Sequence, residues 1–223
     1  MKKVIYGIFG GLAFCLLLTD CGGEKKADAS NNVNNANNVK KVENTKKQLE
    51  TKKEKNLLSE DKDFGKLTSN TQNGGKVTIE NRKDYNTSFS DNNWAGVEVK
   101  VDKISVIKTS PMTSYSDDNY SGFVAIHYII NNSQRDISIY PQQAKISTNY
   151  GEQIDDDSFS TDSWDGDLMK GTNRDGWGIS PLSKLENANQ LKNLRISFNA
   201  NYDTDNVDDD NTHHDYDISL QLQ

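Results

Sequence analysis

The chain has 223 residues, a formal net charge of -7 and only 33% apolar residues, so part of it is expected to lie outside a packed core. Residues 1–60 carry 11 Lys/Arg against 7 Asp/Glu, whereas residues 61–223 carry 15 against 26. An acidic C-terminal part argues against nucleic-acid binding, because neutralising phosphates needs a basic face. The length accommodates one domain of ordinary size plus a tail.

Residues 1–20 have the pattern of a bacterial lipoprotein signal peptide. Two lysines precede an apolar run over residues 4–18, which is shorter than the roughly 20 residues that a membrane-spanning helix needs. The run ends in Leu-Thr-Asp-Cys, which resembles a lipobox whose Cys21 receives diacylglycerol. Asp20 departs from the usual Gly, Ala or Ser, so a plain secretory signal and an uncleaved short anchor remain alternatives. The first expectation is a lipid anchor at the extracellular face of the membrane.

Residues 21–75 are predicted to form a disordered tether. The segment 31–38 is almost entirely asparagine, and residues 40–58 are rich in Lys and Glu with few apolar side chains. Such a composition cannot offset the entropy lost on ordering. As a coil, about 50 residues reach roughly 40 Å, which would lift a domain clear of the bilayer.

Residues 76–223 show the two-residue period of β-strands. Val97, Val99 and Val101 share one face of the first clear strand. Ile104 and Val106 continue the pattern in the opposite phase, which predicts a bulge near residue 103.

Several shorter strands follow. Residues 123–130 are apolar on both faces, as expected of a central strand, and turn residues end it. Four more strands are predicted over residues 137–139, 144–148, 194–198 and 216–222, with Trp177 in another. About seven short strands with hardly any helical period predict an all-β fold, an immunoglobulin-like antiparallel β-sandwich.

A family resemblance supports this fold. It is carried by six motifs in a fixed order, at residues 93–97, 130–133, 136–142, 149–153, 165–171 and 202–205. Together they resemble uncharacterised lipoproteins of low-GC Gram-positive bacteria that carry an immunoglobulin-like domain of unknown function. The resemblance implies an envelope sandwich domain over residues 76–223 and brings no catalytic residues.

Candidate catalytic groups are sparse. His127 lies within the central strand, where a packed or edge-facing imidazole is the ordinary explanation, and His213 and His214 lie in a polar turn. No serine has the sequence context of a nucleophile elbow, and no glycine-rich phosphate loop is present. We therefore expect no enzymatic activity.

Two acidic loops are candidate calcium sites, since Ca²⁺ takes six to eight oxygen ligands and flexible loops can supply them. Neither loop follows the EF-hand spacing, and a merely solvated acidic surface is the favoured alternative. The candidate ligands are Asp155, Asp157, Asp162, Asp165, Asp167, Asp203 and Asp205.

Trp164 lies between two aspartates of the first acidic loop and is expected to be exposed, as a contact for a carbohydrate or a partner protein. The leading hypothesis is a non-enzymatic binding module at the cell envelope, whose partner is an envelope protein or glycan. A calcium-stabilised structural or adhesion domain is the second hypothesis, and a wall-active hydrolase using paired aspartates is the third.

Overall fold

The computed structural model describes residues 56–155, 159 and 162–223. The predicted signal peptide, Cys21 and most of the predicted tether lie outside these residues, as does Asp157. No helix among the residues described is long and apolar enough to cross a membrane.

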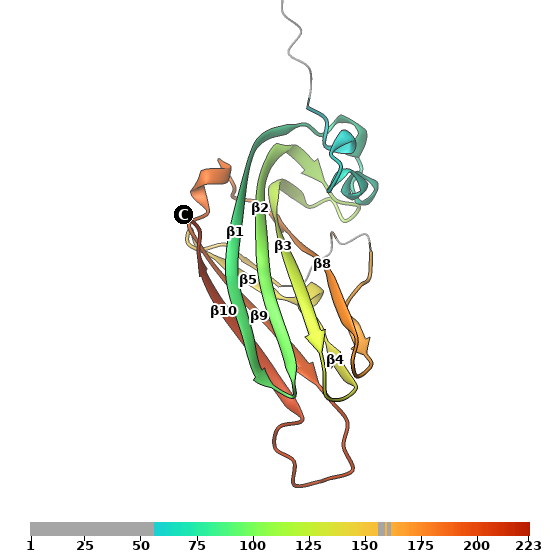
Figure 1. Cartoon of the computed structure of the whole chain (residues 1–223). Helices are drawn as coiled ribbons and strands as arrows, with labels where there is room; N and C mark the ends of the chain where they lie inside the picture. Colours follow the sequence, from blue (N-terminus) through green and yellow to red (C-terminus); the bar gives the residue numbers. More distant parts are fainter. Residues whose placement is uncertain (1–55, 156–158, 160–161) are drawn as a thin grey trace, which may run out of the picture. The chain divides into compact units, whose positions relative to one another are not determined.

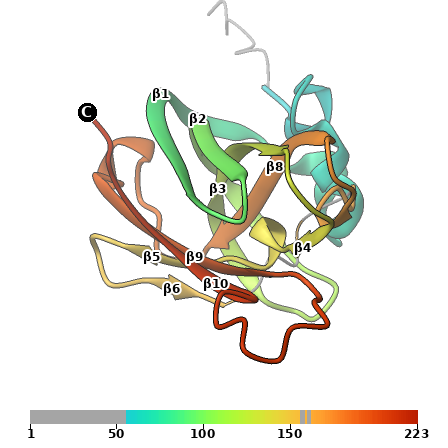
Figure 2. The same ribbon diagram turned by 60° about the horizontal axis from the view of Figure 1, so that its bottom comes forward.

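The described part of the chain is predominantly antiparallel β-sheet, in two layers (Figures 1 and 2). One sheet has the order β1-β2-β3-β8 and the other has the order β6-β5-β9-β4-β7, with β10 paired to β9. The strands of the first sheet are β1 (Ile79–Trp94), β2 (Val97–Thr113), β3 (Asn119–Asn132) and β8 (Asn173–Leu182). The strands of the second are β4 (Ile137–Ile139), β5 (Lys145–Thr148), β6 (Gln153–Ile154), β7 (Gly166–Leu168), β9 (Asn193–Asn201) and β10 (His213–Gln221).

The connections contain short 3-10 helices. Their bounds are η1 (Leu58–Glu60), η2 (Gly65–Asn70), η3 (Gly74–Lys76), η4 (Pro141–Gln143) and η5 (Ala188–Gln190). Pro141 ends the short strand β4 and begins η4, because proline fixes φ and cannot donate to a strand ladder. The predicted all-β class is confirmed.

The predicted bulge in β2 is present. The pairing of β2 with β3 shifts register between Val101 and Lys103. This extra residue reverses the alternation, so Val99 and Val101 before the bulge and Ile104 after it all reach the core between the sheets.

β3 is one of the two interior strands of the first sheet, and residues 122–126 are buried on both faces. Ile126 and Tyr128 face the second sheet and join one core with Phe198 of β9. Phe123 and Ala125 point the other way, into a second core on the outer side of the first sheet. Two sheets alone would leave this outer side exposed to water, so another part of the chain must cover it.

Residues 57–77 supply this cover, and we call them the cap. Leu58, Phe64, Leu67 and Val77 are each at most 2% exposed and pack on the outward side of β2, β3 and β8. The Leu58 backbone N–H donates to the Val77 carbonyl at 2.9 Å, which closes the cap at its base. The predicted tether is therefore too long at its C-terminal end. The apolar residues of the cap are isolated and irregularly spaced, so the sequence has no strand or helix period there. They nevertheless fill the second core.

The strand β1 was also not predicted from the sequence. It is an edge strand with a largely polar side-chain pattern, in which only Tyr85 and Trp94 are buried. Charged and polar side chains are typical of edge strands, because they discourage pairing with other chains.

Replacing Phe64 by Ala tests whether the cap is part of the domain. We expect Phe64→Ala to lower the free energy of unfolding by about 3–5 kcal/mol, because it removes a fully buried ring that contacts Phe123 at 5.5 Å between centroids. Urea unfolding of the full chain measures the change. Tyr115→Ala, at a side chain 71% exposed, is the control and should stay within about 0.5 kcal/mol of wild type. Equal stability of both variants would contradict the packing of the cap.

Candidate functional site

A hollow lies where the cap ends on the outer side of the first sheet. Two adjoining cavities of about 330 and 320 Å³ share Lys62, Asp63 and Trp177 in their linings. We call this pair of cavities the cap groove. The polar and aromatic residues that line it are Lys62, Asp63, Lys66, Arg82, Asp84, Tyr85, Asn86, Lys103, Ser105, His127, Asp162, Trp164, Asp175 and Trp177.

Trp177 occupies the middle of the cap groove, on the outward side of β8. Its ring lies 5.3 Å from that of Phe64 at an interplanar angle of 79°, and 4.9 Å from the His127 ring. Contact with Phe64 anchors one part of the indole in the second core, and the side chain remains half-buried. Trp177, which was predicted to lie in a strand, therefore packs against the second core and also lines both cavities.

His127 lies beside Trp177 and is held by two carboxylates. Its Nδ1 lies 2.6 Å from Asp102 Oδ1 on β2, and its Nε2 lies 3.4 Å from Asp175 Oδ2 on β8. Because an ionised carboxylate only accepts hydrogen bonds, the short contact requires Nδ1–H to donate to Asp102. The two strands that flank β3 thus fix the orientation of the imidazole.

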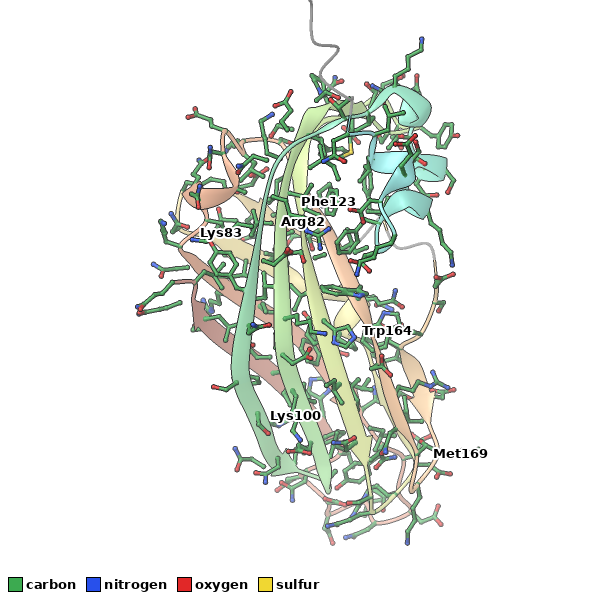
Figure 3. All side chains as sticks on the ribbon, turned by 45° about the horizontal axis from the view of Figure 1, so that its top comes forward. Arg82, Lys83, Lys100, Phe123, Trp164 and Met169 are labelled. Atoms are coloured by element: carbon green, nitrogen blue, oxygen red, sulfur yellow. The ribbon has the colours of Figure 1, made fainter. Side chains whose placement is uncertain are left out.

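Arg82 of β1 ties the cap to the sheet. Its guanidinium contacts Asp61 at 3.0 Å and Asp63 at 3.5 Å in the cap, and Asp84 of β1 at 2.9 Å. Ser105 Oγ donates to the same Asp84 carboxylate at 2.6 Å. Partial burial alone would lower the pKa of Arg82, but the hydrogen bond and charge of Asp84, with the other two carboxylates, raise it overall. The polar wall of the groove is therefore fixed by charge-assisted bonds. Figure 3 labels Arg82 on the first sheet.

Trp164 was expected to be exposed, and this expectation is wrong: its side chain is half-buried against β8. Its Nε1–H donates to the Trp177 carbonyl at 3.0 Å, on the edge of β8 that does not pair with β3. A Cβ at Gly176 would stand 2.4 Å from the Trp164 ring, so only glycine permits this contact. The indole covers a strand edge and also lines one end of the cap groove.

Gln142 fixes the segment that carries Trp164. The Gln142 side-chain carbonyl accepts from the Trp164 backbone N–H at 3.0 Å, and its amide donates to the Asp162 carbonyl at 2.9 Å. In return, the Gln142 backbone N–H donates to the Asp165 carboxylate at 2.9 Å. This reciprocal set holds the acidic loop against η4.

The other candidate calcium ligands do not form one cluster, although Asp167 and Asp203 line the same hollow. Asp155 pairs with Lys145 at 3.3 Å, and Asp162 pairs with Lys66 at 3.1 Å. Asp167 accepts from Ser138 Oγ at 2.6 Å, at a different hollow of about 470 Å³ that Asp203 also lines. Asp205 is exposed in the β9–β10 connection. Within residues 56–155, 159 and 162–223, no three His, Cys, Asp or Glu side chains gather as a metal would require.

Sequence reasoning missed most of the residues that build the cap groove, although it singled out Asp162 and Trp164, which line one end of it. His127 pairs with Trp177 across β3 and β8 and with Lys103 across β3 and β2. These side chains are neighbours only through strand register, and Lys62 and Asp63 join them only through the folded cap. The hydrophobic alternation of single strands carries no information on that register.

Comparisons with known proteins give no functional assignment. The sequence matches no protein-family model and no curated protein. A functionally unknown protein from Listeria monocytogenes EGD-e is similar in structure at 14% identity and a TM-score of 0.46, over 70% of this chain and 92% of that one. A conserved hypothetical protein from Bacillus anthracis is similar at 12% identity and a TM-score of 0.35, over 52% of this chain and 90% of that one. These structural neighbours are uncharacterised bacterial proteins.

The pKa of Asp165 gives a pH-dependent prediction. Burial raises this pKa above its ordinary value, against the lowering by the hydrogen bond from Gln142 and by the charge of Arg174. A raised pKa in the folded state means that the folded chain holds this proton more tightly than the unfolded chain. Asp165 therefore adds stability as the pH falls through its folded pKa, and this added stability is absent at neutral pH.

Asp165→Asn removes this titration and keeps an oxygen acceptor for Gln142. We expect the free energy of unfolding of wild type, relative to Asp165→Asn, to increase between pH 7 and pH 4. Urea unfolding across this range measures the difference. Asp205→Asn, at an exposed carboxylate, is the control. A difference that is flat or falls with decreasing pH would contradict the assigned cause.

Proposed function

We propose that this chain is a non-enzymatic binding module displayed at the outer face of a bacterial cell membrane, and that its ligand binds in the cap groove. One observation carries the proposal: a half-buried tryptophan, Trp177, lines both cavities beside polar side chains whose positions are fixed by other residues. Small-molecule sites combine these features, since apolar area supplies affinity and placed polar groups orient the ligand.

The geometry favours a preformed site. Arg82 joins the wall of the groove to the sheet through three aspartates, and Asp102 and Asp175 hold the His127 ring. Side chains held before binding lose little entropy when a ligand arrives, so less of the interaction energy is spent on ordering them.

Display at the membrane is the second part of the proposal. It rests on the sequence of residues 1–21, with Cys21 as the lipidated residue and an extracellular location. Because the cap belongs to the domain, the proposed tether shortens to the residues between Cys21 and Leu57. Treated as a coil, about 35 residues reach roughly 30–36 Å.

The fold assignment is the third part. We propose that the two sheets form an immunoglobulin-like sandwich, as in Gram-positive lipoproteins with such a domain. In support, antiparallel strands of both sheets contribute to one shared core. The cap and the 17-residue strand β2 distinguish this chain from a minimal sandwich of about 100 residues.

Photo-crosslinking on cells tests the location of the site. A photoreactive residue at position 62, where the Lys62 side chain is 87% exposed on the groove rim, should capture one dominant protein or glycan. The control is the same residue at position 169, where Met169 is 70% exposed and lies far from Arg82 (Figure 3). Capture of the dominant species from position 169, and not from position 62, would place the ligand elsewhere and overturn the assignment.

Fatty-acid labelling tests the anchor. Cells given a clickable palmitate analogue should label the wild-type chain, and Cys21→Ser should lose the label completely, because it removes the thiol that receives the lipid. The matched control is Cys15→Ser, which keeps Cys21 and should label as wild type does. Label retained in Cys21→Ser, or lost in Cys15→Ser, argues against Cys21 as the anchor.

A further inference from the structure

We infer that the ligand of the cap groove is a neutral saccharide, a conclusion that rests on the proposed function and names its ligand class. The inference is drawn from the aromatic floor, the charge balance and the occupied strand edge of the groove. Each of these features is independent of the anchor and of the display at the membrane.

The aromatic floor suits a sugar ring. A pyranose presents a face of C–H groups, which packs on an indole, and a rim of hydroxyls, which needs hydrogen-bond partners. Trp177 supplies the indole, which lines both cavities. Asp63 and Asp175 supply carboxylate acceptors at its sides, and Lys62 supplies a donor. Two adjoining cavities of about 330 and 320 Å³ leave space for more than one ring.

The charge balance of the groove disfavours a strongly anionic ligand. The lining of the two cavities contains four Lys/Arg and four Asp side chains, so the groove itself is electrically balanced. Several of these charges already neutralise each other, as Lys66 does with Asp162 at 3.1 Å and Arg82 does with Asp84. The surrounding residues 61–223 carry 15 Lys/Arg against 26 Asp/Glu, and this surplus repels polyanions at long range.

The strand edge beside the groove disfavours an extended peptide. Peptides commonly bind by adding a strand to a free sheet edge, through backbone hydrogen bonds. At the edge of β8 next to the groove, the Trp177 carbonyl already accepts from Trp164 Nε1 at 3.0 Å. Ligand contacts in the groove therefore come from side chains on the face of the sheet. Such side chains can form hydrogen bonds with the hydroxyl groups of a sugar.

An oligosaccharide array tests the inference. The full chain in detergent is applied to neutral and acidic oligosaccharides printed on the same linker, and hits are titrated by calorimetry. We expect binding to neutral members, with acidic members at least about tenfold weaker because of the acidic surround. Preference for acidic members overturns the inference.

Two variants tie any binding to the groove. Asp175→Ala changes a side chain that is 70% exposed, so the fold is retained, and should weaken neutral-saccharide binding about tenfold through loss of a charged acceptor. Asp205→Ala is the matched control and should stay within about twofold of wild type, since Asp205 is exposed outside the groove. Trp177→Phe keeps an aromatic ring against Phe64 and should also weaken binding. Unchanged affinity in both groove variants overturns the inference.

The outcomes separate this inference from the proposed function. An array with no neutral hit, together with capture of one dominant protein from position 62, overturns the saccharide and leaves the binding module in place. If neutral saccharides bind but Asp175→Ala does not weaken that binding, and position 62 captures nothing, both the saccharide inference and the proposed function are overturned.

Discussion

The two-sided burial of β3 is the constraint on which the rest of the structure depends. Its inner face, with Ile126 and Tyr128, is covered by the second sheet. Its outer face, with Phe123 and Ala125, would expose a contiguous apolar patch if the chain stopped at two layers. Burial of apolar area at about 25 cal/mol per Å² makes a cover favourable, and the cap provides it with Leu58, Phe64 and Leu67. The groove follows from this arrangement, because it lies where the apolar cover ends.

Polar side chains line the outer face of the sheet from the border of the cap onward, for the same reason. Beyond Phe64 the outer face of the sheet is open to water, so its strands carry His127, Lys103 and Asp175. Arg82 lies on this border, with its guanidinium 5.3 Å above the Phe64 ring and bonded to Asp61 on the other side. One side chain thus closes the apolar core and organises the polar wall. A partly buried cation with three carboxylate partners is costly to leave unpaired, which holds the cap in one position.

The sequence predicted the features that depend on local alternation. The change of phase between Val101 and Ile104 predicted the bulge, and the double apolar face of residues 123–130 predicted an interior strand. The cap was missed because Leu58, Phe64 and Leu67 follow neither a strand nor a helix period. Trp164 was placed wrongly because its burial depends on Gly176, twelve residues later, which leaves room for the ring. The groove depends on the register of three strands, which single-strand patterns do not specify.

The position of the cap also bears on the proposed binding and the proposed attachment. The chain enters the domain at Asn56 and reaches the groove rim at Lys62, so the two are a few residues apart in sequence. The acidic β9–β10 connection lies at the opposite end of the sheets (Figure 1). In the proposed function, a ligand in the groove therefore binds beside the cap, near the point where the described chain begins. In the proposed function, attachment and binding share one structural element, the cap, which hydrophobic contacts fix on β3.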